Sequence, residues 1–97
     1  MLERRKVVFS GRVQGVGFRM TAVQLAEDLP VTGTVQNLPD GDVELVVEGE
    51  AADIDALISR LREHFGSHIR TFTQDRSAPL GGKAGKGSRP PGLRVVY

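Results

Sequence analysis

Apolar residues recur along this chain with two different spacings, and the order of those spacings is the strongest constraint on its fold. Alternation of apolar and polar residues predicts a strand with one buried face, whereas apolar residues three or four positions apart predict an amphipathic helix. The segments expected to form strands are residues 5–11, 32–38, 42–48, 69–74 and a short one at 93–97. Two helical segments lie between them, so the order is β-α-β-β-α-β with an additional terminal strand.

Both predicted helices end at a recognisable signal. The first starts at Arg19 and is stopped by Pro30, because proline cannot continue a helix. The second has the cleaner apolar stripe, with Asp53 as its expected N-cap and Gly66 just past its end. Its stripe consists of Ile54, Leu57, Ile58, Leu61 and Phe65.

This order of elements is that of a ferredoxin-like α+β sandwich. The sequence Pro39-Asp40-Gly41 is a turn signal that joins the second and third strands into a hairpin. We expect a βαββαβ topology with an antiparallel sheet, two helices on one face and a short extra C-terminal strand. Residues 1–97 should form a single domain, in which residues 77–92, rich in glycine, proline and lysine, form a flexible loop. The fold alone does not determine function.

The composition excludes several classes of function. The chain has 97 residues, no cysteine, two histidines and a net charge of +1. Without cysteine there is no disulfide framework, no thiolate metal site and no cysteine nucleophile, and two histidines are too few for a histidine-only zinc site. The near-neutral charge does not favour a broad nucleic-acid surface. No secretory signal and no membrane-spanning apolar run is present, so we expect a cytoplasmic protein without nucleic-acid or membrane partners.

The segment that carries chemistry is Gly11-Arg12-Val13-Gln14-Gly15-Val16-Gly17-Phe18-Arg19, between the first strand and the first helix. Its glycines allow the backbone to curl around a ligand, and the first amides of a helix have no partners within that helix. Such a loop suits an anion, and the guanidinium of Arg19 can bind two phosphate oxygens at once. The predicted phosphate-binding loop consists of Val13, Gln14, Gly15, Val16, Gly17 and Phe18. The alternative is a plain connection in which the glycines only permit the turn and Arg19 is solvated.

This segment and Gly33-Thr34-Val35-Gln36-Asn37-Leu38-Pro39-Asp40-Gly41-Asp42-Val43 closely resemble the two signatures of the acylphosphatase family. The resemblance covers about residues 6–65, and the two motifs occur in the family's order. It implies that Arg19 binds the phosphoryl group together with the loop amides and that Asn37 orients the nucleophilic water. The alternative for Asn37 is a turn residue beside Pro39.

The resemblance implies an enzyme, an acylphosphatase that hydrolyses acyl phosphates to a carboxylate and inorganic phosphate without a metal or another cofactor. The leaving carboxylate has a conjugate acid with a pKa of about 4, so no general acid is needed to protonate it. The expected partner is a small-molecule acyl phosphate, and we expect the protein to act as a monomer. A catalytically silent phosphate-binding or anion-binding module is the alternative. The acylphosphatase-like domain of large carbamoyltransferases, which handles carbamoyl phosphate, is a close variant.

Overall fold

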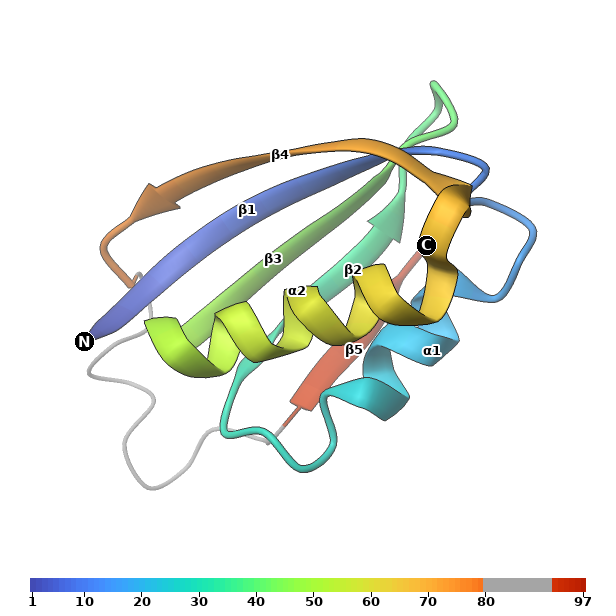
Figure 1. Cartoon of the computed structure of the whole chain (residues 1–97). Helices are drawn as coiled ribbons and strands as arrows, with labels where there is room; N and C mark the ends of the chain where they lie inside the picture. Colours follow the sequence, from blue (N-terminus) through green and yellow to red (C-terminus); the bar gives the residue numbers. More distant parts are fainter. Residues whose placement is uncertain (80–91) are drawn as a thin grey trace.

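The computed structural model describes residues 1–79 and 92–97, which form a five-stranded sheet covered by two helices (Figure 1). The elements are β1 (Leu2–Gly11), α1 (Phe18–Leu25), β2 (Thr32–Asn37), β3 (Val43–Glu50), α2 (Ala51–Phe65), the 3₁₀ turn η1 (Gly66–His68), β4 (Ile69–Ser77) and β5 (Gly92–Val96). The strands lie in the order β4-β1-β3-β2-β5. The predicted α+β class and the order of elements are confirmed.

The sheet is mixed, whereas the sequence predicts an antiparallel one. The strands β4, β1, β3 and β2 do pair antiparallel, as the ferredoxin-like plan requires. The added strand β5 instead pairs parallel with β2, with Gly33 opposite Leu93 and Val35 opposite Val95. The extra strand therefore extends the sheet beyond β2, and it forms one edge while β4 forms the other.

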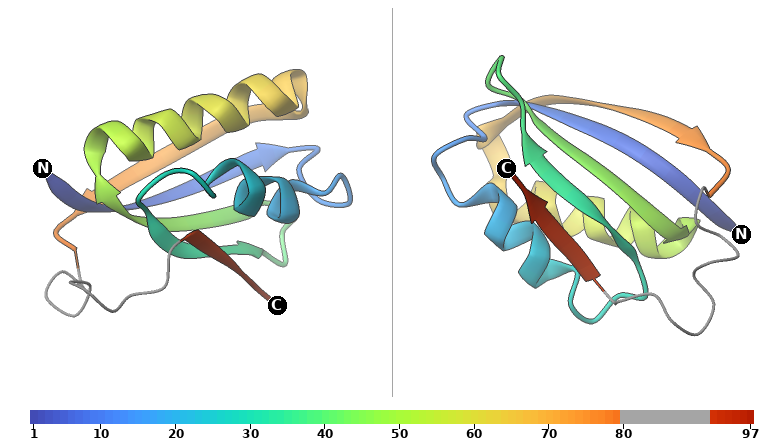
Figure 2. Two further views of the ribbon diagram at one scale, coloured as in Figure 1. Left: turned by 90° about the horizontal axis from the view of Figure 1, so that it is seen from below. Right: turned by 180° about the vertical axis from the view of Figure 1, so that it is seen from behind.

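Both helices lie on the same face of the sheet, as predicted (Figure 2). Alternate residues of the strands point toward them and are buried, among them Val7, Phe9 and Leu45. The predicted apolar stripe of α2 is buried in full. No helix within residues 1–79 and 92–97 is long and apolar enough to cross a membrane.

All four phenylalanines of the chain belong to one aromatic stack in this core. The ring centroid of Phe9 lies 5.1 Å from that of Phe18 and 5.8 Å from that of Phe72. Phe18 in turn lies 4.5 Å from Phe65, on α2. These separations are those of favourable aromatic pairs, so the start of α1 is fixed against β1 and α2.

One of the two arginines of β1, Arg5, is fully buried and joins three elements. Its guanidinium donates hydrogen bonds to Glu3 on its own strand, to Asp55 on α2 at 2.6 Å and to Gln74 on β4 at 2.9 Å. A buried charge requires such partners, because removing it from water without them is costly. The sequence pattern assigned Arg5 only to the start of a strand.

The first helix is shorter than predicted. It ends at Leu25, although only Pro30 was expected to stop it. The amide of Ala26 donates to the carbonyls of both Ala22 and Val23, which is the shared pattern typical of a helix end. The chain then turns back toward β2.

The second helix begins earlier than predicted. Glu50 occupies the N-cap position and Asp53 lies within the first turn, so the expectation that Asp53 caps the helix was wrong. The reason is that β3 continues to Glu50, where it pairs with Leu2, and runs directly into the helix. Toward the C-terminus, the flexible loop predicted for residues 77–92 begins and ends within strands, because Ser77 is the last residue of β4 and Gly92 the first of β5. Its residues 80–91 lie outside the described part of the chain.

Candidate functional site

The connection between β1 and α1 presents backbone amides at a helix N-terminus. Gly17 occupies the N-cap position of α1 with φ 79° and ψ 22°, in the left-handed region that favours glycine. Gly15 has the same φ of 79°. No side chain caps the helix within the described residues, so its first amides face outward without a side-chain acceptor. An anion is the natural partner for such amides.

Six of the eight predicted site residues line one small cavity of about 130 Å³. It is lined by Val13, Gly15, Gly17, Phe18, Arg19, Met20 and Asn37. The cavity therefore brings together Arg19, from the first turn of α1, and Asn37, the last residue of β2. Val13 and Phe18 are buried and form its apolar floor. Of the predicted loop, Gln14 and Val16 do not line the cavity.

Gln14 fastens the loop to the hairpin that carries Asn37. Its side-chain amide donates to the carbonyl oxygen of Leu38 at 2.8 Å and to that of Asp42 at 2.9 Å. Both carbonyls belong to the turn between β2 and β3. Gln14 therefore sets the distance between the β1–α1 loop and the hairpin that carries Asn37. This role is structural, and the sequence motif alone did not distinguish it from phosphate binding.

Arg19 is half-buried, and its charge is not neutralised by a carboxylate within residues 1–79 and 92–97. Its guanidinium carbon lies 4.9 Å from the centroid of the Tyr97 ring, in a cation–π contact. Such a contact holds the side chain and leaves its N–H donors available for an anion. Among the described residues that line the cavity, Arg19 is also the only charged one.

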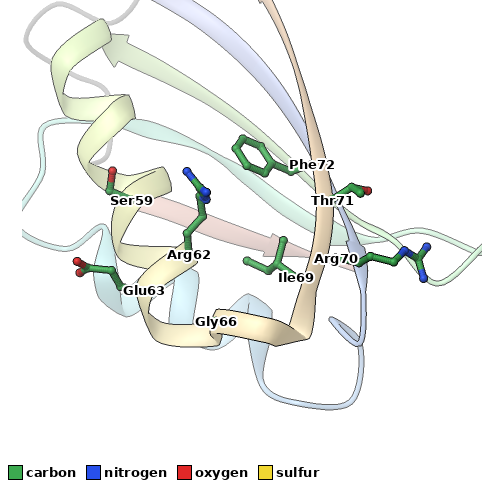
Figure 3. Close-up of a pocket in the computed structure, with 8 residues that line it drawn as sticks. All are labelled: Ser59, Arg62, Glu63, Gly66, Ile69, Arg70, Thr71 and Phe72. Carbon is green, nitrogen blue, oxygen red and sulfur yellow. The ribbon is translucent and has the colours of Figure 1, made fainter.

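A larger groove of about 610 Å³ lies elsewhere, between α2 and β4 (Figure 3). Figure 3 shows Arg62, Ile69 and Phe72 pointing into the space between the two elements, whereas Arg70 points to the other side of the strand. Arg62 lies 5.0 Å over the Phe72 ring. None of the predicted site residues lines this groove, and its described lining residues include neither an asparagine nor the N-terminus of an α-helix. The smaller cavity is therefore the candidate site in spite of its size.

Two residues of the site were missed by the sequence analysis or given another role. Met20 was given no role in the site, yet it lines the cavity and is exposed. Tyr97 was assigned only to a terminal strand, yet it contacts Arg19. The sequence did hold a sign that Met20 lies at the site, because it follows Arg19 directly. It held none for Tyr97, whose position depends on the pairing of β5 with β2. Among the residues that the structure describes, no three histidine, aspartate or glutamate side chains gather in a way that could hold a metal ion.

Comparison with known proteins gives a consistent set of relatives. The sequence model of the acylphosphatase family matches residues 5–85. An acylphosphatase of Methylococcus capsulatus is 51% identical over 61 residues, which are 63% of this chain and 66% of that protein. An acylphosphatase of Bordetella parapertussis is 46% identical over 77 residues, which are 78% of this chain and 82% of that protein. The crystal structure of acylphosphatase from Bacillus subtilis superposes with a TM-score of 0.80 at 27% identity, covering 100% of both chains.

Proposed function

Because this chain belongs to the acylphosphatase family, we propose that Arg19 and the loop amides bind the phosphoryl group of an acyl phosphate and that Asn37 orients the attacking water. The chain is an enzyme, a hydrolase of the acylphosphatase type. The assignment of roles rests on one observation: Arg19 and Asn37 share a cavity with the glycines of the loop.

The phosphoryl group is held by charge and by directed donors. Catalysis of phosphoryl transfer depends mainly on positioning and on stabilising the charge of the equatorial oxygens. The outward amides at the start of α1 and the guanidinium of Arg19 supply those donors from one side of the cavity. The buried apolar floor of Val13 and Phe18 lowers the local dielectric, which strengthens each of these interactions.

Asn37 faces the same cavity from the end of β2. Its side-chain amide has both donors and an acceptor, so it can hold a water molecule with a lone pair directed at phosphorus. The water oxygen forms a new bond to phosphorus while the bond from phosphorus to the acyl oxygen breaks. The electron pair leaves with the carboxylate, and the proton of the water passes to a phosphate oxygen. A protein base and a metal ion are then dispensable.

The test is turnover of acetyl phosphate and benzoyl phosphate by the purified protein in the presence of a chelator. Arg19→Lys should lower kcat/KM by about 100-fold or more, because a point charge does not replace the bidentate fork. Arg70→Lys is the matched control, since Arg70 is exposed and lies outside the cavity. Asn37→Ala should lower kcat while inorganic phosphate still binds, and its control is Gln36→Ala on the neighbouring position.

Three results would oppose the assignment. Retained turnover in Arg19→Lys would show that the bidentate fork is not required, and retained turnover in Arg19→Ala would exclude Arg19 as the phosphate ligand. Binding of inorganic phosphate by the unaltered protein without turnover of either substrate would favour the catalytically silent anion-binding module. The cytoplasmic location and the monomeric state stay predictions, and size-exclusion chromatography with light scattering tests the second.

A further inference from the structure

The outer edge of β4 is an exposed strand edge in the described part of the chain. β4 lies at one end of the sheet and pairs with β1 alone. Its nine residues, Ile69–Ser77, include neither proline nor lysine, which commonly protect such an edge. From residue 70 to residue 77, the backbone groups that point away from β1 have no backbone partner within residues 1–79 and 92–97. Such groups can pair with an added strand.

The groove between α2 and β4 reaches this edge (Figure 3). Its floor is apolar, because Ile69 and Phe72 point into it and pack against the core. Arg70 and Thr71 also line the groove, although their side chains point to the other side of the strand, so they contribute their backbone. A molecule bound in the groove can therefore contact both the apolar floor and the backbone of β4.

The side chain of Arg62 gives the groove a positive charge. Its guanidinium carbon lies 5.0 Å from the centroid of the Phe72 ring, and no carboxylate pairs with it within residues 1–79 and 92–97. Figure 3 shows the other charged lining residues pointing elsewhere, Glu63 away from β4 and Arg70 to the other side of the strand. One cation beside an apolar floor complements an acidic group next to an apolar one.

The pairing of β4 with β1 shows which side chains of β4 face α2. Phe72 lies opposite Phe9 and Arg76 lies opposite Arg5, and residues directly opposite each other point to the same face of a sheet. Phe9 and Arg5 are buried on the face that the helices cover, so Phe72, Gln74 and Arg76 share that face. Because side chains on one face of a strand stand two residues apart, a strand added beside β4 would present alternate residues to the groove.

A second copy of this chain is a poor occupant of the groove. Antiparallel pairing of two β4 edges would place the helix-facing residues of the copy beside the groove. None of these residues is acidic, and Arg76 is among them, which would repel Arg62. Asp75, the only acidic residue of β4, lies on the other face, opposite Lys6. The groove therefore suits a different chain, in which an apolar and an acidic residue are separated by one residue.

We propose that the groove between α2 and β4 binds an extended peptide, which pairs with the outer edge of β4 as an additional strand. An apolar side chain of the peptide packs on Ile69 and Phe72, and an acidic side chain two positions away pairs with Arg62. The backbone of β4 supplies affinity, whereas the apolar floor and Arg62 select the sequence. This surface is independent of the function proposed above, since the described lining residues of the groove and of the small cavity do not overlap.

The probe is a fluorescein-labelled peptide of about eight residues, the length of an ordinary strand. It has threonine at every position except for one valine and a glutamate two positions after it. Fluorescence anisotropy measures its affinity for the unaltered protein. Replacing the glutamate by lysine should weaken binding about 10-fold, because a charge-assisted hydrogen bond is lost. Of two peptides methylated on alternate backbone amides, one should lose binding and the other keep it, because only every second amide faces β4.

The matched variants are Arg62→Glu and Arg94→Glu. Arg62→Glu should reverse the preference, so that the lysine peptide binds more tightly than the glutamate peptide. Arg94→Glu should leave the preference unchanged, because Arg94 is exposed on β5 at the opposite edge of the sheet. Bound glutamate peptide should also slow hydrogen exchange of the β4 amides. Thermal unfolding shows that each variant is folded.

Several outcomes would overturn the proposal. They are the absence of measurable binding, equal binding of the glutamate and lysine peptides by the unaltered protein, and an unchanged preference in Arg62→Glu. Equal binding of both methylated peptides would exclude pairing with the strand edge. A dimer of the unaltered protein in which the β4 amides are protected without peptide would also overturn the proposal, because a second copy would then occupy the edge.

Discussion

The bridge between the loop and the hairpin can be removed by one substitution, Gln14→Met. Methionine has nearly the volume and shape of glutamine but donates no hydrogen bond. The substitution removes the two bonds from Gln14 to the carbonyls of Leu38 and Asp42 and leaves the rest of the cavity in place. It therefore tests whether the spacing between the loop and Asn37 depends on this side chain.

The expected loss of stability in Gln14→Met depends on the hydrogen bonds that the two carbonyl oxygens keep. The carbonyl of Leu38 still accepts from the amide of Gly41 at 3.1 Å, and that of Asp42 still accepts from the amide of Leu38 at 2.8 Å. Neither oxygen is left without a partner, so each lost bond should cost about 1 kcal/mol. The free energy of unfolding should fall by about 2 kcal/mol, which lowers Tm by about 8–16 °C in a domain of this size.

The assay is thermal unfolding followed by circular dichroism, together with kcat for benzoyl phosphate. Gln24→Met is the matched control, because Gln24 is exposed on α1 and methionine and glutamine have similar helix propensities. Gln14→Met should lower both Tm and kcat, since the hairpin that carries Asn37 loses its attachment to the loop. Equal Tm and kcat in Gln14→Met and the control would refute the reasoning.

Two further predictions concern the sheet and the surface. Gly33→Ala should lower the free energy of unfolding, measured by urea titration, by about 3 kcal/mol. The reason is that Gly33 has a φ of 156° and that an added Cβ would lie 1.9 Å from the carbonyl oxygen of Val46. A loss of less than about 0.5 kcal/mol would contradict this prediction. Arg60 donates hydrogen bonds to Asp28 at 2.6 and 3.3 Å and holds the pKa of that carboxyl below its ordinary value of 3.8. The Arg60–Asp28 ion pair therefore contributes to stability above the unfolded-state pKa of Asp28, about 4. This contribution is lost as the pH falls through the lower folded-state pKa of Asp28. In urea titrations, the unaltered protein should have a slightly higher free energy of unfolding than Asp28→Asn at about pH 6, and this difference should be gone at about pH 2. A difference that does not change with pH would exclude the ion pair as its cause.

The elements were predictable where the signal is local. The stripe of α2 identifies both the helix and its buried face, since residues three and four apart share one side of a helix. The start of the same helix was not predictable, because it depends on how far β3 pairs with β1. Leu2 opposite Glu50 extends both strands, and neither residue fits an alternating apolar pattern. The partner of β5 was hidden for the same reason, since strand pairing is decided by contacts between distant parts of the chain.

In the site too, local features were predictable from the sequence and contacts between distant segments were not. The two motifs predict which loops matter, and the cavity includes Arg19 and Asn37 as the sequence suggested. The contacts of Gln14 and Tyr97 join distant segments, so no spacing in the sequence indicates them. Met20 was not identified from the sequence, because an apolar residue in a first helical turn usually packs inward. Here Phe18 and Ala22 take the inward positions of that turn, and the intervening Met20 faces solvent.

The place of β1 inside the sheet, between β4 and β3, has a consequence for how the protein acquires its activity. Its two neighbours, β3 and β4, come from much later in the chain: Leu2 pairs with Glu50, and Arg4 pairs with Ser77. The chain must close these long loops before the pairing contributes any stability, which places folding in the slow range of milliseconds to seconds. The loop between β1 and α1 is anchored at one end by β1 and attached to the β2–β3 hairpin through Gln14, so it acquires its shape only when the sheet is complete. Recovery of activity during refolding should therefore coincide with the last and slowest structural phase.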